Sequence, residues 1–222
     1  MRYYPVFMDV TDKTCLVVGG GSVGTRKALG LLKAGARVKV VSPAMTDPLL
    51  AAACESPMLE LVVRPFEPGD MNGVSLVFAA TDHQALNARV RTAAAEAGVL
   101  CNAADGEDKG DFILPSVVSR GDLLLAVSTC GASPALAKAI RKRLEQSFGP
   151  EYETLTRLLA RVRQRLLEQG HDPAGHKQVL TTLVEQDLAP LLAVRDHAAV
   201  DQILFQVLGQ GFSWDSLGIE EP

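Results

Sequence analysis

A run of glycines near the N-terminus has the spacing that phosphate-binding chemistry requires. The segment VVGGGSVG satisfies the pattern G-x-G-x-x-G with Gly19, Gly21 and Gly24. In such a turn the first glycine permits a tight bend, the second lets a pyrophosphate approach the backbone, and the third lets helix and strand pack closely. We therefore predict that these glycines bind a dinucleotide together with Ser22 and Val23. The alternative is a glycine turn with a purely structural role.

The ribose part of the expected site lacks its usual acidic residue. An NAD site of this kind carries Asp or Glu about 20 residues further on, where it binds the ribose hydroxyls. The strand end here reads Ser42-Pro43-Ala44, with no acid and no arginine for a 2′-phosphate. Ser42 or backbone groups of this segment are expected to hold the ribose, and spacing alone leaves NAD and NADP open. Thr81 and Asp82, which follow a later strand, are predicted to border the nicotinamide side.

Alternating strands and helices must position these residues. Short β-branched, apolar runs alternate with Ala- and Leu-rich stretches of helical composition in the first half of the chain. This alternation predicts a parallel sheet with helices on both faces and a ligand crevice beyond the carboxyl ends of its strands. The expected strands cover residues 14–18, 37–41, 59–64, 75–80 and 99–102, and the expected helices cover residues 23–34, 49–54 and 84–97.

The second half of the chain has a different pattern. A strand pair is expected at 112–118 and 123–129, followed by a helix from Ser133, a good N-cap, to about residue 147. Only helices are expected from residue 151 onward. The apolar stripe of the first helix is expected to contain Leu136, Ile140, Leu144 and Phe148. The predicted domains are residues 1–112, 113–150 and 151–222.

The overall composition argues against several classes of protein. The 222 residues carry 22 Lys+Arg against 26 Asp+Glu, and this formal charge of −4 argues against a nucleic-acid-binding protein. No stretch reaches the roughly 20 apolar residues of a membrane span, and no signal-peptide core begins the chain, so we expect a cytoplasmic protein. The four cysteines and four histidines lack metal-ligand spacing, so no metal site is predicted and the thiols are expected to be buried.

Five motifs follow one another in the first 150 residues: GGGSVGTRKA at 19–28, AATD at 79–82, CNAAD at 101–105, FILPS at 112–116 and VSTCGASP at 127–134. Together they resemble the precorrin-2 dehydrogenase / sirohydrochlorin ferrochelatase family of sirohaem synthesis. The resemblance implies an α/β fold with a Rossmann-like doubly wound parallel sheet that binds NAD, a small α+β dimerisation element and a helical C-terminal region. It implies a homodimer that oxidises precorrin-2 to sirohydrochlorin with NAD⁺ as hydride acceptor.

The resemblance also assigns roles to single residues. The family's essential aspartate matches Asp105, where a carboxylate is a suitable base for the proton that leaves with the hydride. Without the resemblance, an Asp before a glycine is more typical of a turn. The family's marked serine matches Thr129, and Cys130 stands where the family often has glycine. These two departures add side-chain bulk to the expected tetrapyrrole cleft.

The implied substrate is a polycarboxylate, which gives cationic side chains of the middle region a possible role. Arg120, Lys138 and Arg141 are hypothetical contacts for its carboxylates, and ordinary surface charges are the alternative.

Two other functions compete with the dehydrogenase. A bifunctional enzyme would also insert ferrous iron into sirohydrochlorin, a step that the sequence does not decide. A nucleotide-sensing regulatory module would share the glycine turn, but such modules commonly keep the acidic ribose residue and would have no use for Asp105.

Overall fold

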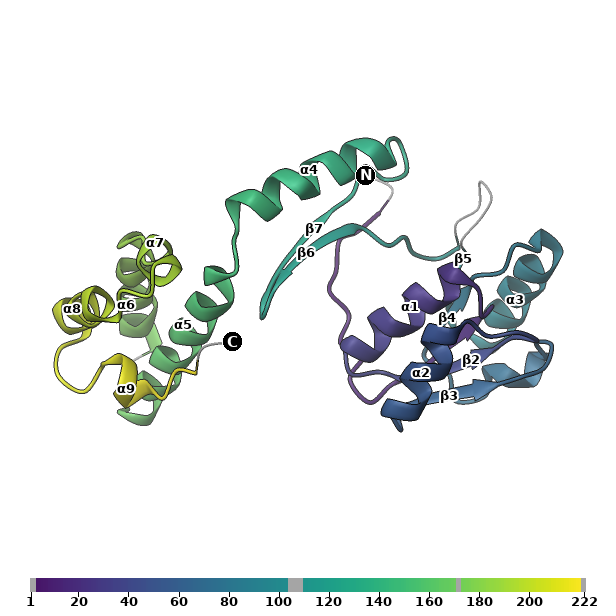
Figure 1. The fold of residues 1–222 in the computed structure, drawn as a ribbon, viewed down its shortest axis with the longest axis horizontal. Coiled ribbons are helices and arrows are strands. Elements are labelled where there is room, and N and C mark those ends of the chain that lie inside the picture. The colour runs from purple at the N-terminus through teal and green to yellow at the C-terminus, as the bar shows by residue number, and fades with distance from the viewer. Residues whose placement is uncertain (1–2, 104–109, 171–172, 221–222) are drawn as a thin grey trace. The chain divides into compact units, whose positions relative to one another are not determined.

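The computed structural model describes residues 3–103, 110–170 and 173–220. The chain forms two compact units, Met1–Leu114 and Pro115–Pro222, and Figure 1 shows the elements of each. The boundary lies close to the predicted end of the first domain, while the further division at residue 150 stays a prediction. Within the described residues, no helix combines the length and the apolar character needed to cross a membrane.

The first unit contains a five-stranded parallel sheet of order β3-β2-β1-β4-β5. This order confirms the predicted doubly wound fold, and the direction of winding changes between β1 and β4. The strands are β1 (Thr14–Val18), β2 (Arg37–Val41), β3 (Leu59–Val62), β4 (Leu76–Ala79) and β5 (Leu100–Ala103). The helices are α1 (Ser22–Lys33), α2 (Asp47–Glu55), the 3₁₀ helix η1 (Pro68–Met71) and α3 (Gln84–Ala97).

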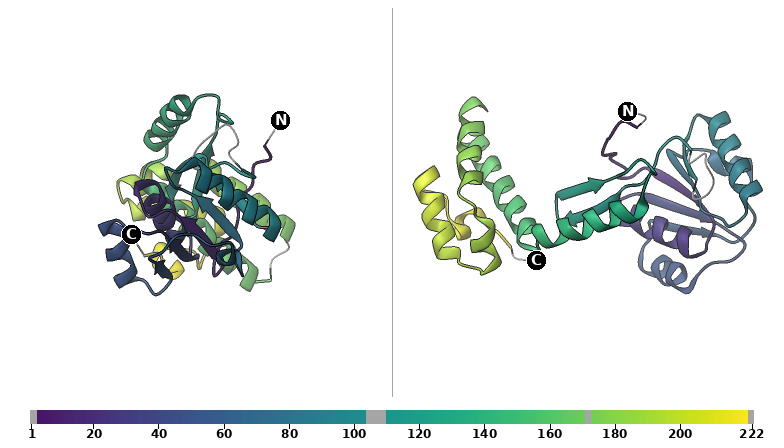
Figure 2. Two further views of the ribbon diagram at one scale, coloured as in Figure 1. Left: turned by 90° about the vertical axis from the view of Figure 1, so that its right-hand side faces the viewer. Right: turned by 90° about the horizontal axis from the view of Figure 1, so that it is seen from above.

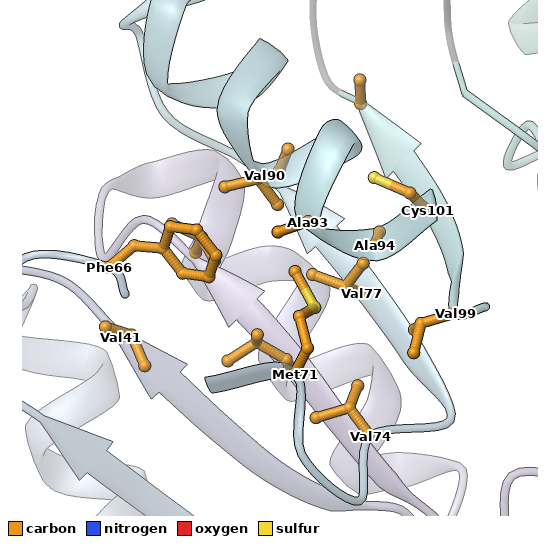
Figure 3. Close-up of a cluster of buried hydrophobic side chains, with 14 residues drawn as sticks. Val41, Phe66, Met71, Val74, Val77, Val90, Ala93, Ala94, Val99 and Cys101 are labelled. Carbon is orange, nitrogen blue, oxygen red and sulfur yellow. The ribbon is translucent and has the colours of Figure 1, made fainter. Parts of the chain in front are cut away.

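Both faces of this sheet are buried, which explains why its strands read as nearly continuous apolar runs. Successive side chains of β1 enter opposite faces, so Leu16 and Val18 pack on one side and Cys15 and Val17 on the other. Figure 3 shows the first cluster, in which Val90 and neighbouring alanines of α3 lie against the sheet. The second cluster lies on the side of α1 and α2.

The second unit begins with an antiparallel hairpin and continues as helices. Strands β6 (Ser116–Arg120) and β7 (Leu123–Val127) pair, and α4 (Pro134–Ser147) packs along the hairpin (Figure 2). Ser133 caps α4 as predicted, because its hydroxyl accepts the N–H of Leu136 at 3.2 Å. The remaining helices are α5 (Glu151–Glu168), α6 (Pro173–Glu185), α7 (Ala189–Ala193), α8 (His197–Leu208) and α9 (Trp214–Leu217).

The predicted strand at 112–118 is wrong in its first half. Strand β6 begins only at Ser116, directly after Pro115, which has no N–H to donate to a ladder. Phe112 instead packs edge-on against Phe78 of β4, with ring centroids 5.5 Å apart. Phe112 therefore packs in the first unit, whereas the strand that begins at Ser116 belongs to the second.

The apolar stripe predicted on α4 is only partly covered, since Ile140, Leu144 and Phe148 are half-buried. Within α4 only Ala137 is buried, and Leu136 is 52% exposed. Val117 and Leu124, on the hairpin face that points away from α4, are each 44% exposed. In contrast, α5 buries an apolar stripe in the helical core of the second unit through Leu158, Val162 and Leu166.

The expectation that all four thiols are buried is wrong for two of them. Cys15 and Cys101 are buried, and burial raises the pKa of the Cys15 thiol. Cys54 and Cys130 are exposed, because they lie at the end of a surface helix and in the turn before α4.

Candidate functional site

The glycine turn after β1 has the geometry that its spacing predicts. Gly19 adopts φ +116°, and a Cβ on it would lie 2.5 Å from the carbonyl oxygen of Ala80 at the end of β4. A Cβ on Gly24 would lie 1.8 Å from the carbonyl oxygen of Gly19. Gly21 has no heavy atom of the described residues within 4 Å of such a Cβ. The first and third glycines are thus required by internal packing, whereas the second leaves open space beside the backbone.

A further glycine has a role that the motif does not include. A Cβ on Gly20 would lie 2.2 Å from the carbonyl oxygen of Ala44, and the Gly20 carbonyl accepts the N–H of Thr46 at 3.2 Å. The Thr46 hydroxyl is 2.7 Å from that of Thr25 on α1. The segment after β2 is thereby held against the turn, and three consecutive glycines were the signal available in the sequence.

The N-terminus of α1 is suited to an anion. Gly21 is the N-cap, no side chain in the described ranges caps the helix, and its first turn holds no acidic residue. The N–H groups of this first turn and the positive end of the helix dipole are therefore available to a phosphate. Ser22 is exposed and Val23 is half-buried beside this end.

The cations near the end of β2 are already paired with a carboxylate. Ser42 is half-buried, and Pro43 and Ala44 are exposed. Lys39 of β2 and Arg64, which follows β3, both bind the carboxylate of Asp70 at 2.9 and 2.7 Å. With both cations engaged by a carboxylate, the residues around Ser42 resemble a site for a ribose hydroxyl more than one for a 2′-phosphate.

The loop after β4 is held by a buried amide that the sequence reading missed. The Asn87 side chain, fully buried in α3, accepts the N–H of Thr81 at 3.2 Å and its hydroxyl at 2.7 Å. Its Nδ2 donates to the Thr81 carbonyl at 2.9 Å. Asp82, the next residue, is exposed. A polar residue on the apolar side of the predicted helix was the only sequence signal for Asn87.

A second missed contact joins α1 to β5. The Nζ of Lys27 donates to Oδ1 of the buried Asn102 at 2.9 Å and lies 5.2 Å from the ring centroid of Phe78. Asn102 in turn donates through Nδ2 to the carbonyl of Phe112 at 2.8 Å. Burial lowers the pKa of Lys27, and the neighbouring Arg26 lowers it further.

The predicted catalytic residue Asp105 lies outside the described residues and stays a prediction. The structure describes what flanks its segment: Ala103 ends β5, and Gly110 forms an antiparallel bridge with Asn102. Asp111 follows, with its N–H donating to the Cys101 carbonyl and its carboxylate accepting the Cys101 N–H, each at 2.8 Å. Both flanks are therefore attached to β5 at the carboxyl edge of the sheet.

The four residues predicted to bind substrate do not form one cluster. Thr129 lies before α4, and its hydroxyl accepts the N–H of Ser133 at 3.0 Å. Arg120 lies at the other end of α4, where Nε donates to the Phe148 carbonyl at 2.9 Å. The 14 residues of α4 separate these ends by about 20 Å.

The remaining two predicted contacts lie on α4 itself. Arg141 forms an ion pair with Glu145 one turn further along, whereas Lys138 is exposed and has no ion pair with any described residue. Lys138, in the half of α4 nearer to Thr129, is therefore the better placed of the two to meet a carboxylate.

Two family models match the chain in succession. The NAD(P)-binding model matches residues 6–116, half of the chain, and the model described as sirohaem biosynthesis protein central matches residues 120–147. The first range contains the glycine turn, the loop after β4 and β5. The second range begins within the hairpin and ends with α4.

Relatives with known names agree with these models. Sirohaem synthase of Methylococcus capsulatus is 38% identical over 86% of this chain and 40% of its own length. Sirohaem synthase 1 of Aeromonas salmonicida is 39% identical over 91% of this chain and 43% of its own length, so the chain spans about two fifths of these relatives. SirC, a precorrin-2 dehydrogenase of solved structure, is 28% identical with a TM-score of 0.73 over 90% of this chain and 98% of that one. The chain belongs to the NAD(P)-binding family whose model matches its residues 6–116.

Proposed function

We propose that the protein oxidises precorrin-2 to sirohydrochlorin, with NAD⁺ as the hydride acceptor. The observation that carries this proposal is the glycine turn, which leaves open space beside Gly21 at an uncapped helix N-terminus. This turn lies between β1 and β4, where a doubly wound sheet holds its ligand. The likeness to SirC over nearly the full length of both chains supports the same reaction.

The residues at the turn fit a dinucleotide. The N–H groups at the start of α1 would hold the pyrophosphate, and Ser42 would hold the adenine ribose. Thr81, fixed by Asn87, and Asp82 would border the nicotinamide. The pairing of Lys39 and Arg64 with Asp70 favours NAD over NADP. When bound, the cofactor supplies an acceptor for the hydride.

The oxidation also releases a proton, and we assign its removal to Asp105. Precorrin-2 loses a hydride to NAD⁺ and a proton to a base, and a carboxylate within hydrogen-bond reach accepts such a proton. Thr129, Arg120, Lys138 and Arg141 remain the proposed contacts for the substrate carboxylates. Of these, Lys138 keeps an unpaired ammonium among the described residues.

The direct test is incubation of the purified chain with precorrin-2 and NAD⁺ while NADH absorbance is followed. Asp105→Ala is expected to abolish NADH formation and keep NAD⁺ binding. Asp108→Asn, in the same segment, serves as the matched control and is expected to retain activity. Absence of NADH formation by the wild type would refute the proposal. Incubation with sirohydrochlorin and ferrous iron tests the bifunctional alternative, since iron insertion above the uncatalysed rate would add that activity.

We also propose that the hairpin and α4 form a homodimer interface. An isolated two-stranded hairpin is marginal in water, and here α4 covers only one of its faces. The other face exposes Val117 and Leu124, and such apolar patches mark interaction sites. A second copy of this chain would cover this face symmetrically.

Light scattering after size exclusion tests the homodimer. The wild type is expected to elute as a dimer, and Leu124→Lys is expected to elute as a folded monomer. Leu167→Lys, at another exposed leucine, on α5, is the control and should remain dimeric. A monomeric wild type at micromolar concentration would overturn this part of the proposal.

A further inference from the structure

Lys27 places an ammonium group against the carboxyl ends of β4 and β5. Its Nζ lies 2.9 Å from Oδ1 of Asn102 and 5.2 Å from the ring centroid of Phe78. Phe78 and Asn102 are the penultimate residues of the two strands. The ammonium therefore lies on the β5 side of the switch point, away from the Ser42 side.

This ammonium has no counter-charge among the described residues. Its hydrogen-bond acceptor is a neutral amide, whose orientation is set by the second bond from Nδ2 to the Phe112 carbonyl. Lys27 is half-buried, and a lysine is rarely removed from solvent without a partner charge, because desolvation disfavours its charged form. The lowered pKa of Lys27 reflects that cost. An apolar side chain of similar length would pack between α1 and Phe78 without it.

We propose that the Lys27 ammonium makes the bound NAD a stronger hydride acceptor. This inference rests on the proposed function, which places the nicotinamide at the ends of β4 and β5. The oxidised nicotinamide ring carries a positive charge that is lost when the ring accepts a hydride. A fixed positive charge nearby disfavours the oxidised form relative to the reduced form, so it favours hydride transfer from the substrate.

The two forms of the cofactor separate this effect from phosphate binding. NAD⁺ and NADH share the pyrophosphate and differ by one charge on the nicotinamide ring. A lysine that acts on the phosphates strengthens the binding of NAD⁺ and of NADH by the same factor. A lysine that acts on the ring changes the ratio of the two dissociation constants, Kd(NAD⁺)/Kd(NADH).

The experiment measures both constants by calorimetry and NADH fluorescence for wild type and variants. Lys27→Met removes the charge, Lys27→Gln removes it but keeps a donor for Asn102, and Lys27→Arg keeps both. The ratio is expected to fall about ten- to twentyfold in the Met and Gln variants, the size expected for unit charges roughly 10 Å apart near a protein surface. In Lys27→Arg the ratio is expected to keep its wild-type value. Lys33→Met, exposed at the other end of α1, is the matched control and should not change the ratio.

Three outcomes would overturn the inference. Equal weakening of both ligands would assign Lys27 to the phosphates, and an unchanged ratio would leave its charge without effect on the ring. A wild-type ratio in Lys27→Gln alone would assign the effect to the orientation of Asn102. If thermal unfolding shows that Lys27→Met does not fold, the ratios measured for Lys27→Gln and Lys27→Arg test the proposal. A wild type that binds neither ligand would refute the proposed function itself, whereas binding of both with an unchanged ratio refutes only the role of Lys27.

Discussion

The two sheets of this molecule contrast in how they are covered. Every residue of β4, and all but the first of β1, is buried between two layers of helices and connecting segments. In the hairpin, exposed residues recur along both strands, and only Val118 is buried. The parallel sheet is thus covered by the helices of its own unit, whereas the hairpin leaves the apolar side chains of Val117 and Leu124 exposed. The difference indicates that residues 1–114 are shaped by internal fit, and it motivates the homodimer interface that we propose for the hairpin.

The charges show the same contrast. The Asp70 side chain is 1% exposed and binds both Lys39 and Arg64. Burial alone would raise its pKa, but hydrogen bonds from Arg64, the Glu67 N–H and Lys39 hold the pKa of Asp70 well below its usual range. On α4, the pair Arg141–Glu145 is partly exposed. Four predictions test how far this contrast holds.

The largest effect is expected at the glycine turn. Gly24→Ala places a methyl group where the Gly19 carbonyl lies, so we expect a loss of about 3 kcal/mol or more in the free energy of unfolding. Gly21→Ala meets no described atom and has φ −76°, so its cost should stay below about 1 kcal/mol. Its NAD⁺ affinity should nevertheless fall, because the methyl group occupies the space beside the phosphates. Chemical denaturation measures the free energy of unfolding, and calorimetry measures the NAD⁺ affinity. Equal stability of Gly24→Ala and Gly21→Ala would contradict the packing requirement at Gly24.

The buried ion cluster should give the next effect. Asp70→Asn leaves two cations without their partner, and we expect a loss of about 3 kcal/mol at pH 7. Because the folded pKa is depressed, this stabilisation is complete above the unfolded pKa of about 4 and decreases as the pH falls toward the folded value. Urea unfolding at pH 7 and pH 3 should therefore show a smaller difference between wild type and variant at pH 3.

The surface pair on α4 is the comparison for this cluster. Glu145→Gln is expected to cost about 0.5 kcal/mol or less, since the pair is partly exposed and screened by solvent. Similar losses for Asp70→Asn and Glu145→Gln would remove the contrast between the two units.

A smaller effect is expected at the loop after β4. Asn87→Ala leaves the Thr81 N–H and carbonyl without their buried partner, which should cost about 2 kcal/mol. NAD⁺ affinity should fall as well, because Thr81 borders the proposed nicotinamide position. Thermal unfolding and calorimetry provide the readouts, with the exposed Asn72→Ala as the control. Unchanged affinity in a destabilised Asn87→Ala would limit Asn87 to a structural role.

A small gain in stability is expected in the turn before α4. Cys130 adopts φ +54°, a conformation that favours glycine. Cys130→Gly should raise the free energy of unfolding by about 0.5 kcal/mol, since relief of strain exceeds the added entropy of the unfolded chain. Gly131→Ala, at φ +90°, should lower it. Denaturant titration distinguishes the two, and a destabilised Cys130→Gly would show that the thiol contributes a contact.

Patterns local in sequence predicted much of this fold. Strand β1, the glycine turn and the N-cap Ser133 depend on periodicity and backbone preference over a few residues, and all three were predictable. The start of β6 was not, because an apolar run does not reveal which of its residues will pack elsewhere. Phe112 leaves the expected strand to contact Phe78, more than thirty positions earlier in the chain.

The sequence by itself determined the doubly wound sheet, the glycine turn and the family motifs, because short-range spacing encodes each of them. Only the tertiary structure decided which side chains support the site. Lys27 meets Asn102 across 75 positions, and Asn87 reaches back to Thr81 from within a helix. Such contacts form when α1 and α3 pack on the sheet, because a polar group that burial removes from water needs a hydrogen-bond partner within the protein.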